Sequence, residues 1–475
     1  MKRRSSHARV LFALVAVLSL LTTACGSRLS KEERAEAIAA VSGGEATGGT
    51  TTGDGAGATG GGDGDGATGG GATGGGASTD GGGGTGGGGA AAGTASCAKA
   101  SKATDTGVTA NEITVATLAD VSGVQPGLFQ SAHQAARAAG AYINSVGGIC
   151  GRQVKVLPLD SKTDSGGNRS AMLEACQKAF AVVGSMSAFD DGSAKPGQDC
   201  GIPDMTAVTT NAAKYAATNT YPIYPNSAQA TSTTSARYIA KRFPDVIRKA
   251  AILWLNQAVT ASNAANRRKV WESVGYEFIY EAEVQVLEAN YTRFVSEMEN
   301  RGVQYVTMVA DYQNINRLQK AMRQQGYVPK VRDWDSVAYD PDYLADQQAV
   351  EGSFVFINTA MFEEASSNPE TKLYIDWLQR ASPGAPPDYF GLHAWSAYRL
   401  FQKLASEIGP DLTREKLLAA LKATKEWGAN GLHGPHQTGA KLPTTCNLYV
   451  EVKGGKFRRM APASGFDCSG NLFTG

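Results

Sequence analysis

From residue 113 to residue 325, short apolar runs alternate with longer helical stretches. The runs predict strands at 113–119, 154–160, 180–184, 202–208, 250–255, 277–284 and 303–309. The stretches between them predict helices at 131–144, 167–179, 191–200, 229–242, 260–274, 291–301 and 314–325. Strands that alternate with helices of about 10–15 residues are typical of parallel sheets with right-handed connections. The pattern therefore predicts an α/β fold.

The alternation forms two series, one before and one after about residue 229, which predicts two similar lobes. Ligands of open α/β sheets bind beyond the carboxyl ends of the strands. Two lobes that face each other would line a cleft with those ends. A later helix near 391–406 carries Trp395, Tyr398 and Phe401 at helical spacing, which we interpret as core packing rather than as a cofactor site.

Composition changes this picture at the N-terminal side. Of the 57 Gly in 475 residues, 27 lie in the 51 residues 43–93. Such a tract has almost nothing to bury and cannot offset the entropy of ordering, so we expect 42–96 to be a disordered tether. Its r.m.s. span is about 40 Å. A single globule of the whole chain is excluded, and the absence of a Gly-X-Y period excludes collagen.

The N-terminus has the features of a targeting segment. Four basic residues precede the apolar run 10–21, which is too short to span a bilayer stably. Small residues then lead to Cys25, which resembles a bacterial lipobox. This resemblance implies a lipoprotein signal peptide at 1–24 and a lipid-anchored Cys25, followed to residue 41 by a short helix. The alternative is ordinary secretion with Cys25 removed.

Charge argues against a nucleic-acid partner. The whole chain has a formal charge of +1, and loss of the four basic residues of the leader changes this from 45 − 44 to 41 − 44, or −3. A near-neutral mature chain lacks the basic surface that nucleic acids require.

Six cysteines follow the tether, and an even count in an exported chain indicates disulfides. Cys176 and Cys200 each precede an expected strand, so they lie within bridging reach if those strands are parallel neighbours. Cys446 and Cys468 bracket a stretch that turns at the glycine pair 454–455. The remaining pair joins the end of the tether to the folded region. The expected disulfides are thus Cys97–Cys150, Cys176–Cys200 and Cys446–Cys468.

Signals of metal binding or catalysis are weak. No cysteine pair has C-x₂-C spacing, and there is no G-x-S-x-G, no H-E-x-x-H and no phosphate-binding glycine turn after a strand. His433 and His436 have metal-like spacing, but they lie in an expected turn without clustered carboxylates. We therefore expect no metal, no cofactor and no enzyme activity.

The sequence around residues 113–164 resembles a known family. Asn144 is followed by Gly147-Gly148-Ile149 and then by Gly151-Arg152, and the next strand ends in Asp160. This run resembles the opening of the leucine/isoleucine/valine-binding proteins, the type I periplasmic binding proteins of ABC importers. The similarity extends over about 108–475. It implies two Rossmann-like lobes with parallel sheets, joined by three crossovers around a ligand cleft.

The resemblance also implies where the lobes divide and what the protein does. The crossovers are expected near 226–231, 352–358 and 428–432. Lobe one would be 108–228 plus 358–430, and lobe two 229–357 plus 431–475. The implied function is that of an extracytoplasmic, lipid-anchored monomer that captures an amino-acid-like or other small polar ligand between its lobes and delivers it to an ABC permease. A tethered sensor with the same lobes is the alternative.

In the family, two lobe-one loops hold the ligand's carboxylate and amine. Here these loops contain Ser187, Ala188 and Phe189 and, after the next strand, Thr209 and Thr210. Hydroxyls and helix N-terminal amides suit an oxyanion, although turn and capping roles explain the same residues. Asp190 or Asp191 could cap the next helix. If either faced the cleft, an amine or a polyol would fit better than a carboxylate.

The lobe-two candidates come from the same resemblance. Tyr312 occupies a position where the family often places an aromatic side chain, and Asp335 matches the acid that binds the ligand's amine. Core packing and a surface loop are the respective alternatives. The remaining candidates are weaker and comprise Gln257 and Tyr339 in lobe two and Gln125 and Phe129 in the loop after the first strand.

Overall fold

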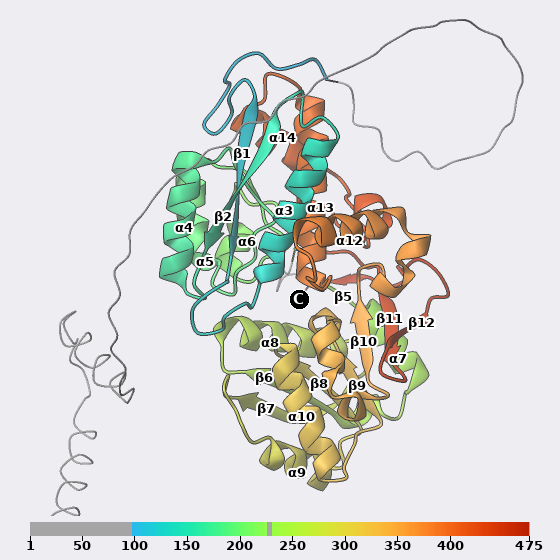
Figure 1. The fold of residues 1–475 in the computed structure, drawn as a ribbon. Coiled ribbons are helices and arrows are strands. Elements are labelled where there is room, and N and C mark those ends of the chain that lie inside the picture. Colours follow the sequence, from blue (N-terminus) through green and yellow to red (C-terminus); the bar gives the residue numbers. More distant parts are fainter. Residues whose placement is uncertain (1–96, 226–229, 475) are drawn as a thin grey trace, which may run out of the picture. The chain divides into compact units, whose positions relative to one another are not determined.

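The computed structural model describes residues 97–225 and 230–474. All of them belong to one compact unit. The expected signal peptide at 1–24, the lipid-anchored Cys25, the short helix to residue 41 and the tether at 42–96 lie outside the described residues. The described chain forms two lobes, each built on its own sheet (Figure 1). This confirms the α/β fold.

Lobe one is a four-stranded parallel sheet in the order β2-β1-β3-β4. Its strands are β1 (Glu112–Ala119), β2 (Gln153–Asp160), β3 (Ala181–Val183) and β4 (Asp204–Met205). Its helices are α3 (Gln130–Ser145), α4 (Ser165–Lys178), α5 (Asp191–Asp199), α6 (Ala212–Ala216), α12 (Pro369–Ala381), α13 (Tyr389–Ile408) and α14 (Arg414–Ala423). β4 is shorter than the strand expected at 202–208, because only its first residues pair continuously with β3.

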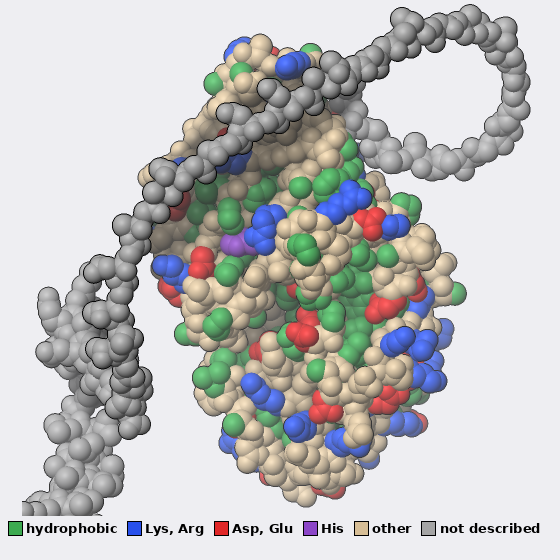
Figure 2. All heavy atoms as spheres, in the orientation of Figure 1, with side chains coloured by type: hydrophobic (Ala, Val, Ile, Leu, Met, Phe, Trp, Pro, Cys, Tyr) green, Lys and Arg blue, Asp and Glu red, His purple; other side chains and the backbone are tan. Residues whose placement is uncertain are grey.

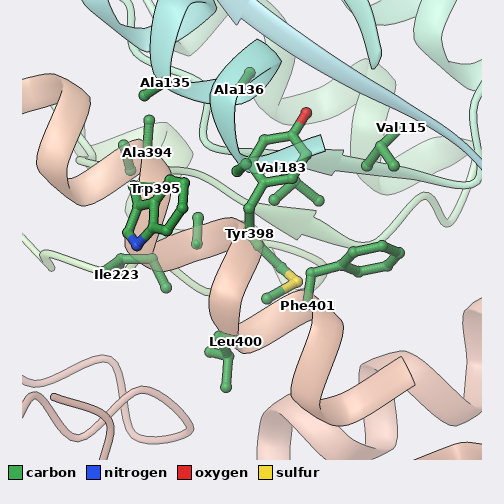
Figure 3. Close-up of a cluster of buried hydrophobic side chains, with 14 of the residues drawn as sticks. Val115, Ala135, Ala136, Val183, Ile223, Ala394, Trp395, Tyr398, Leu400 and Phe401 are labelled. Atoms are coloured by element: carbon green, nitrogen blue, oxygen red, sulfur yellow. The ribbon is translucent and has the colours of Figure 1, made fainter. Parts of the chain in front are cut away.

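The core of lobe one forms between α13 and the sheet. α13 packs against α3 and β3, so a late segment of the chain completes the lobe that the first strands began. Trp395, Tyr398 and Phe401 are fully buried, as expected for core residues. Figure 3 shows them with Val183 of β3 and with Ile223 from the segment that follows α6.

Lobe two has a seven-stranded sheet in the order β12-β11-β10-β9-β8-β6-β7. The first five strands in the sequence pair in parallel, and the last two form an antiparallel hairpin at the edge. They are β6 (Ala250–Leu255), β7 (Phe278–Val284), β8 (Tyr305–Val309), β9 (Val331–Trp334), β10 (Phe354–Ile357), β11 (Leu448–Val452) and β12 (Phe457–Ala461). Its helices are α7 (Thr234–Arg242), α8 (Ala258–Glu272), α9 (Thr292–Asn300), α10 (Tyr312–Gln324) and α11 (Gln347–Val350).

A small two-stranded sheet changes the start of lobe two. The helix expected at 229–242 begins only at Thr234, because β5 (Thr231–Ser232) precedes it and pairs with β13 (Leu472–Phe473). The hairpin turn expected at the glycine pair is present. Gly454 and Gly455 both have positive φ, which a side chain would strain.

The second connection between the lobes runs beside the segment 432–434. The amide of Gly434 donates to the carbonyl of Asn358 at 2.7 Å, and the amide of Ala360 donates to Leu432 at 2.8 Å. These bonds form a short antiparallel pairing where the chain leaves β10. The first expected connection lies largely in 226–229, outside the described residues.

The third connection differs from its expected position. After residue 432 the chain still packs on lobe one, since Lys441 Nζ donates to the carbonyls of Tyr215 and Ala217 at 3.0 and 2.7 Å. These carbonyls end α6, where a cation is favoured. The final segment of lobe two therefore begins just before β11 rather than at residue 431.

Three disulfides are present, and they are the pairs expected from the sequence. They join Cys97 to Cys150, Cys176 to Cys200 and Cys446 to Cys468. The first ties the start of the described chain to the turn before β2. Among residues 97–225 and 230–474, no helix combines the length and the apolar character that a membrane crossing requires.

A buried cluster of three histidines lies where the connections meet lobe one. The rings of His393, His433 and His436 have centroids 5.2–6.4 Å apart, and all three side chains are buried. His433 and His436 are thus not in an exposed turn. In the part of the chain that the structure describes, no group of His, Cys, Asp or Glu is arranged to hold a metal ion.

Burial keeps these histidines neutral and makes stability depend on pH. Desolvation lowers the pKa of His393 to about 3 and that of His433 to about 4. In the unfolded chain both would take up protons near pH 6.5. Their contribution to stability is therefore complete above pH 6.5 and is lost as the pH falls below it, at about 1.4 kcal/mol per pH unit for each.

We expect His393→Phe to remove one such contribution. Between pH 7 and pH 5, the unfolding free energy of the variant relative to the parent should rise by about 2 kcal/mol. Urea unfolding of both proteins at the two pH values measures this difference. Burial raises the pKa of Asp333 to about 7, so this carboxyl group makes the protein less stable as the pH rises, whereas the histidines make it more stable. Both proteins contain Asp333, so its contribution cancels when the variant is compared with the parent. A difference that does not change with pH would contradict the prediction.

Candidate functional site

A cavity of about 810 Å³ lies between the two lobes. It is lined by residues that follow the carboxyl ends of β1, β3 and β4 in lobe one and of β6, β8 and β9 in lobe two. Parallel strands direct all these loops to the same edge of each sheet. The two edges face each other, so the cavity occupies the cleft expected from the strand order.

Seven of the eleven candidate ligand residues line this cavity. They are Gln125, Phe129, Ala188 and Thr210 in lobe one and Gln257, Tyr312 and Asp335 in lobe two. Ser187, Phe189 and Thr209 lie in the same lobe-one loops but are not among the lining residues. The structure thus brings together most of a set of residues that are far apart in the sequence.

Tyr339 does not form a wall of the cleft. It is 2 % exposed and belongs to the core of lobe two, where its ring stacks on Phe362 and lies against Phe457. Its hydroxyl bonds the carboxylate of Glu363 and accepts from the amide of Phe362 at 2.7 Å. The 3₁₀ turn Ser336–Ala338 carries the chain away from the cleft before residue 339, which the sequence pattern does not reveal.

The expected oxyanion donors of the first lobe-one loop are engaged within the protein. Buried Asp120, which follows β1, accepts from the hydroxyl of Ser187 and from the amide of Ala188, both at 2.8 Å. The hydroxyl of Ser187 in turn accepts from the amide of Phe189 at 3.1 Å.

The second loop is engaged in the same way. Asp190 accepts from the amides of Thr210 and Asn211 at 2.7 and 2.9 Å, and it does not cap α5 with its side chain. The hydroxyl of Thr210 donates to the carbonyl of Ser187 at 2.8 Å. Desolvation raises the pKa of Asp190 to about 6 despite these bonds. The two loops are therefore held by carboxylates of the chain itself.

In lobe two, Asp335 forms an ion pair with Arg267, and both side chains are largely buried. Arg267 also donates to Thr307 Oγ1 at 3.1 Å, and its guanidinium lies over the rings of Trp271 and Phe356. The candidate counter-ion for a ligand amine thus already has a cation. Arg267 is missed by the sequence reasoning, since a mid-helix arginine has no signal of its own.

Aromatic side chains form a wall that the sequence reasoning also misses. Tyr389 and Phe390 at the start of α13 line the cavity together with Tyr224. The ring of Phe129 lies 4.8 Å from Phe390 in an edge-on arrangement. A signal is present in retrospect, because Asp388 caps α13 and places the next two residues at the mouth of the cleft.

Acidic side chains outnumber basic ones around the cavity. The acids are Asp311, Asp335, Asp340, Asp342 and Asp388, and the bases are Arg267 and Arg317. Burial raises the pKa of Asp340 to about 6, and the nearby charge of Asp388 adds to the shift. Asp340 belongs to lobe two and Asp388 to lobe one, so the charge of an acid in one lobe raises the pKa of an acid in the other. Figure 2 shows red acidic side chains among green apolar ones over the boundary between the lobes.

Comparison with known proteins agrees with this geometry. The model of the periplasmic binding protein family matches residues 112–456, which includes both sheets and the cleft. The chain belongs to the periplasmic binding protein family. Proteins of this family bind solutes outside the cytoplasm. No curated protein matches this sequence.

Solved structures share the fold of this periplasmic binding protein at low identity. A fatty acid ABC transporter substrate-binding protein from Thermomonospora curvata has a TM-score of 0.64 and 17% identity, covering 79% of this chain and 95% of its own. LivJ of Streptococcus pneumoniae in complex with isoleucine has a TM-score of 0.62 and 14% identity, covering 74% of this chain and 100% of its own. A solute-binding protein from R. palustris in complex with 4-hydroxybenzoate has a TM-score of 0.63 and 16% identity, covering 77% and 97%.

Proposed function

We propose that this periplasmic binding protein is the solute-binding lipoprotein of an ABC importer. It captures a small polar ligand between its lobes and delivers the ligand to a permease. The cavity carries this proposal, because its volume suits a small molecule and its lining combines apolar walls with a few polar groups. The structural relatives support it, since they include substrate-binding proteins of ABC transporters.

The proposal extends to the anchor and the tether. Cys25 would carry the lipid, and the segment 42–96 would let the two lobes stand away from the membrane. The expected lobe boundaries, with the third connection moved to just before β11, define the folded receptor. We propose a monomer without cofactor and without catalytic activity.

Ligand binding is tested by thermal unfolding of the purified protein with a broad panel of amino acids, amides, polyamines, sugars, fatty acids and aromatic acids. A ligand at 100 times its Kd stabilises the folded state by about 2.7 kcal/mol, which raises the melting temperature by several degrees. If no compound shifts the transition and no small molecule is retained after native purification, the proposed function is wrong.

Tyr312 supplies a site-directed prediction. Its ring lines the cavity at the start of α10, and its hydroxyl lies 3.4 Å from Asp342 Oδ2. For the panel compound with the largest shift, we expect Tyr312→Ala to weaken binding about tenfold, since a ring contact contributes about 1–2 kcal/mol. Titration calorimetry measures the affinity.

Tyr280 provides the matched control. It lies on β7, is also only partly buried, and does not line the cavity. Tyr280→Ala should leave the affinity unchanged. Equal losses in both variants would indicate a general effect on the lobe and would remove Tyr312 from the binding site.

A further inference from the structure

The chemistry of the ligand follows from which hydrogen-bonding groups of the cleft are already used. In lobe one, the amides of Ala188 and Thr210 point to Asp120 and Asp190, and neither aspartate lines the cavity. These two donors are thus directed away from the cleft. A carboxylate placed against these loops would find few free donors and two buried carboxylates behind them.

The fully buried side-chain polar atoms that lack partners at the cavity are acceptors. Among the described residues that line it, the buried side-chain atoms without a hydrogen bond are Oδ1 of Asn358 and Oδ1 of Asn447. Asn358 is 3 % exposed and also bonds Tyr389, so its orientation is fixed from the other side. A buried acceptor without a donor is costly, and a ligand N–H would satisfy it.

Charge points to the same kind of ligand. When the pair Arg267–Asp335 is set aside, four acids face one base, Arg317, which itself donates to Asn314 Oδ1 at 3.2 Å. Asp340 and Asp388 each cap a helical turn with one carboxylate oxygen, accepting from the amides of Asp342 and Gly391. The carboxylate of Asp388 is also hydrogen-bonded to Ser131. A cation between the lobes would relieve the repulsion between the two carboxylates.

We propose that the cleft takes an organic amine with an apolar body and no carboxylate, and that Asp120 and Asp190 set this specificity by occupying the lobe-one donors. Phe129, Tyr389 and Phe390 would hold the apolar body, and the ammonium group would lie toward Asp340, Asp388 and Asn358. This inference rests on the proposed function as a solute receptor, which it narrows to a ligand class.

The test uses two matched sets of probes with the purified full-length protein. One set is phenethylamine, phenylalanine and 3-phenylpropanoate, and the other is 3-methylbutylamine, leucine and 4-methylpentanoate. We expect each amine to bind at least tenfold more tightly than the amino acid or the acid of its set, as measured by calorimetry. Equal or tighter binding of a carboxylate would overturn the proposal and would favour an anion at the start of α8, which has no side-chain cap.

Charge-neutral variants test the acids directly. Asp340→Asn keeps the capping acceptor but removes the charge, and we expect it to weaken amine binding about tenfold. Asp346→Asn is the control, because Asp346 caps α11 in the same way outside the cavity. Unchanged amine binding in Asp340→Asn would overturn the assignment. Asn358→Leu removes the unpartnered acceptor and should also weaken amine binding, and its melting temperature shows whether the variant is folded.

Mass spectrometry of small molecules retained by the natively purified protein tests the proposed ligand class separately from the proposed function as a solute receptor. A retained molecule with a basic nitrogen and no carboxylate supports the inference, whether or not the six probes bind. A retained carboxylic acid, or a molecule without basic nitrogen, overturns the inference but leaves the receptor function intact. No retained molecule and no response to any probe or panel compound would count against solute binding itself.

Discussion

Lys214→Met should destabilise the folded region by about 3–5 kcal/mol. Lys214 on α6 forms an ion pair with Asp204 of β4, and the two side chains are 3 % and 0 % exposed. Its ammonium group also donates to Ser193 Oγ at 2.8 Å. Without the lysine, the carboxylate of Asp204 would remain buried without a cation. Urea unfolding measures the loss of stability. Because α6 directly follows the loop that contains Thr210, the affinity for ligand should also fall, and ligand titration measures this second effect.

Two further variants identify the cause of this loss. Lys195 forms an exposed pair with Asp199 on neighbouring α5, and Lys195→Met should change stability by less than about 0.5 kcal/mol. The double variant Lys214→Met with Asp204→Asn removes both charges and should recover much of the stability. A double variant no more stable than Lys214→Met alone would show that packing, not charge, is responsible.

Trp395→Ala should cost about 3–5 kcal/mol, since it empties the centre of the lobe-one core. Trp395 is fully buried on α13 (Figure 3). Its ring lies 5.6 Å from the ring of Tyr142 and 5.7 Å from that of Tyr374. Its indole N–H donates to Glu370 Oε1 at 2.9 Å. The substitution therefore creates a cavity and also removes a hydrogen bond from a buried carboxylate.

The control for this prediction is Trp377 on α12. It packs edge-on against the same Tyr142 but is only partly buried. Trp377→Ala should cost clearly less than Trp395→Ala in urea unfolding. Trp395→Phe should lie between the parent and Trp395→Ala, because it keeps a ring but not the N–H. Equal costs at both tryptophans would contradict the central role of α13.

The strand and helix order of both lobes could be predicted because alternating apolar and helical segments report on local structure. The short strands β9 and β10 and helices α12 and α14 escape this reasoning. β9 contains the charged pair Arg332-Asp333 in the middle of a buried strand. Arg332 is satisfied by distant carbonyls, including that of Ala349 at 2.7 Å, a contact that only the tertiary fold supplies.

The cleft could be predicted in position but not in chemistry. Tyr312 follows the expected strand at 303–309, so strand order is enough to bring it to the edge of the sheet. Asp335 follows β9, which the pattern does not predict, and only the family resemblance indicates its position. Ser187 and Asp120 are 67 residues apart in the sequence, and they meet because they follow β3 and β1, which are neighbours in the sheet. The pairing of Asp335 with Arg267 likewise depends on how α8 packs against the sheet. Residue type and order do not determine such contacts.

The discontinuity of lobe one has a consequence for how the chain comes to be folded. β1 to β4 are synthesised first, but α13, which covers their core side, follows only after the strands β6 to β10 of lobe two. A growing chain therefore exposes the apolar side of its first sheet while the strands β6 to β10 are made. Lobe one is thus completed only after most of the lobe-two strands have been made, and the disulfides Cys97–Cys150 and Cys176–Cys200 lie wholly within the part of lobe one that is made before them.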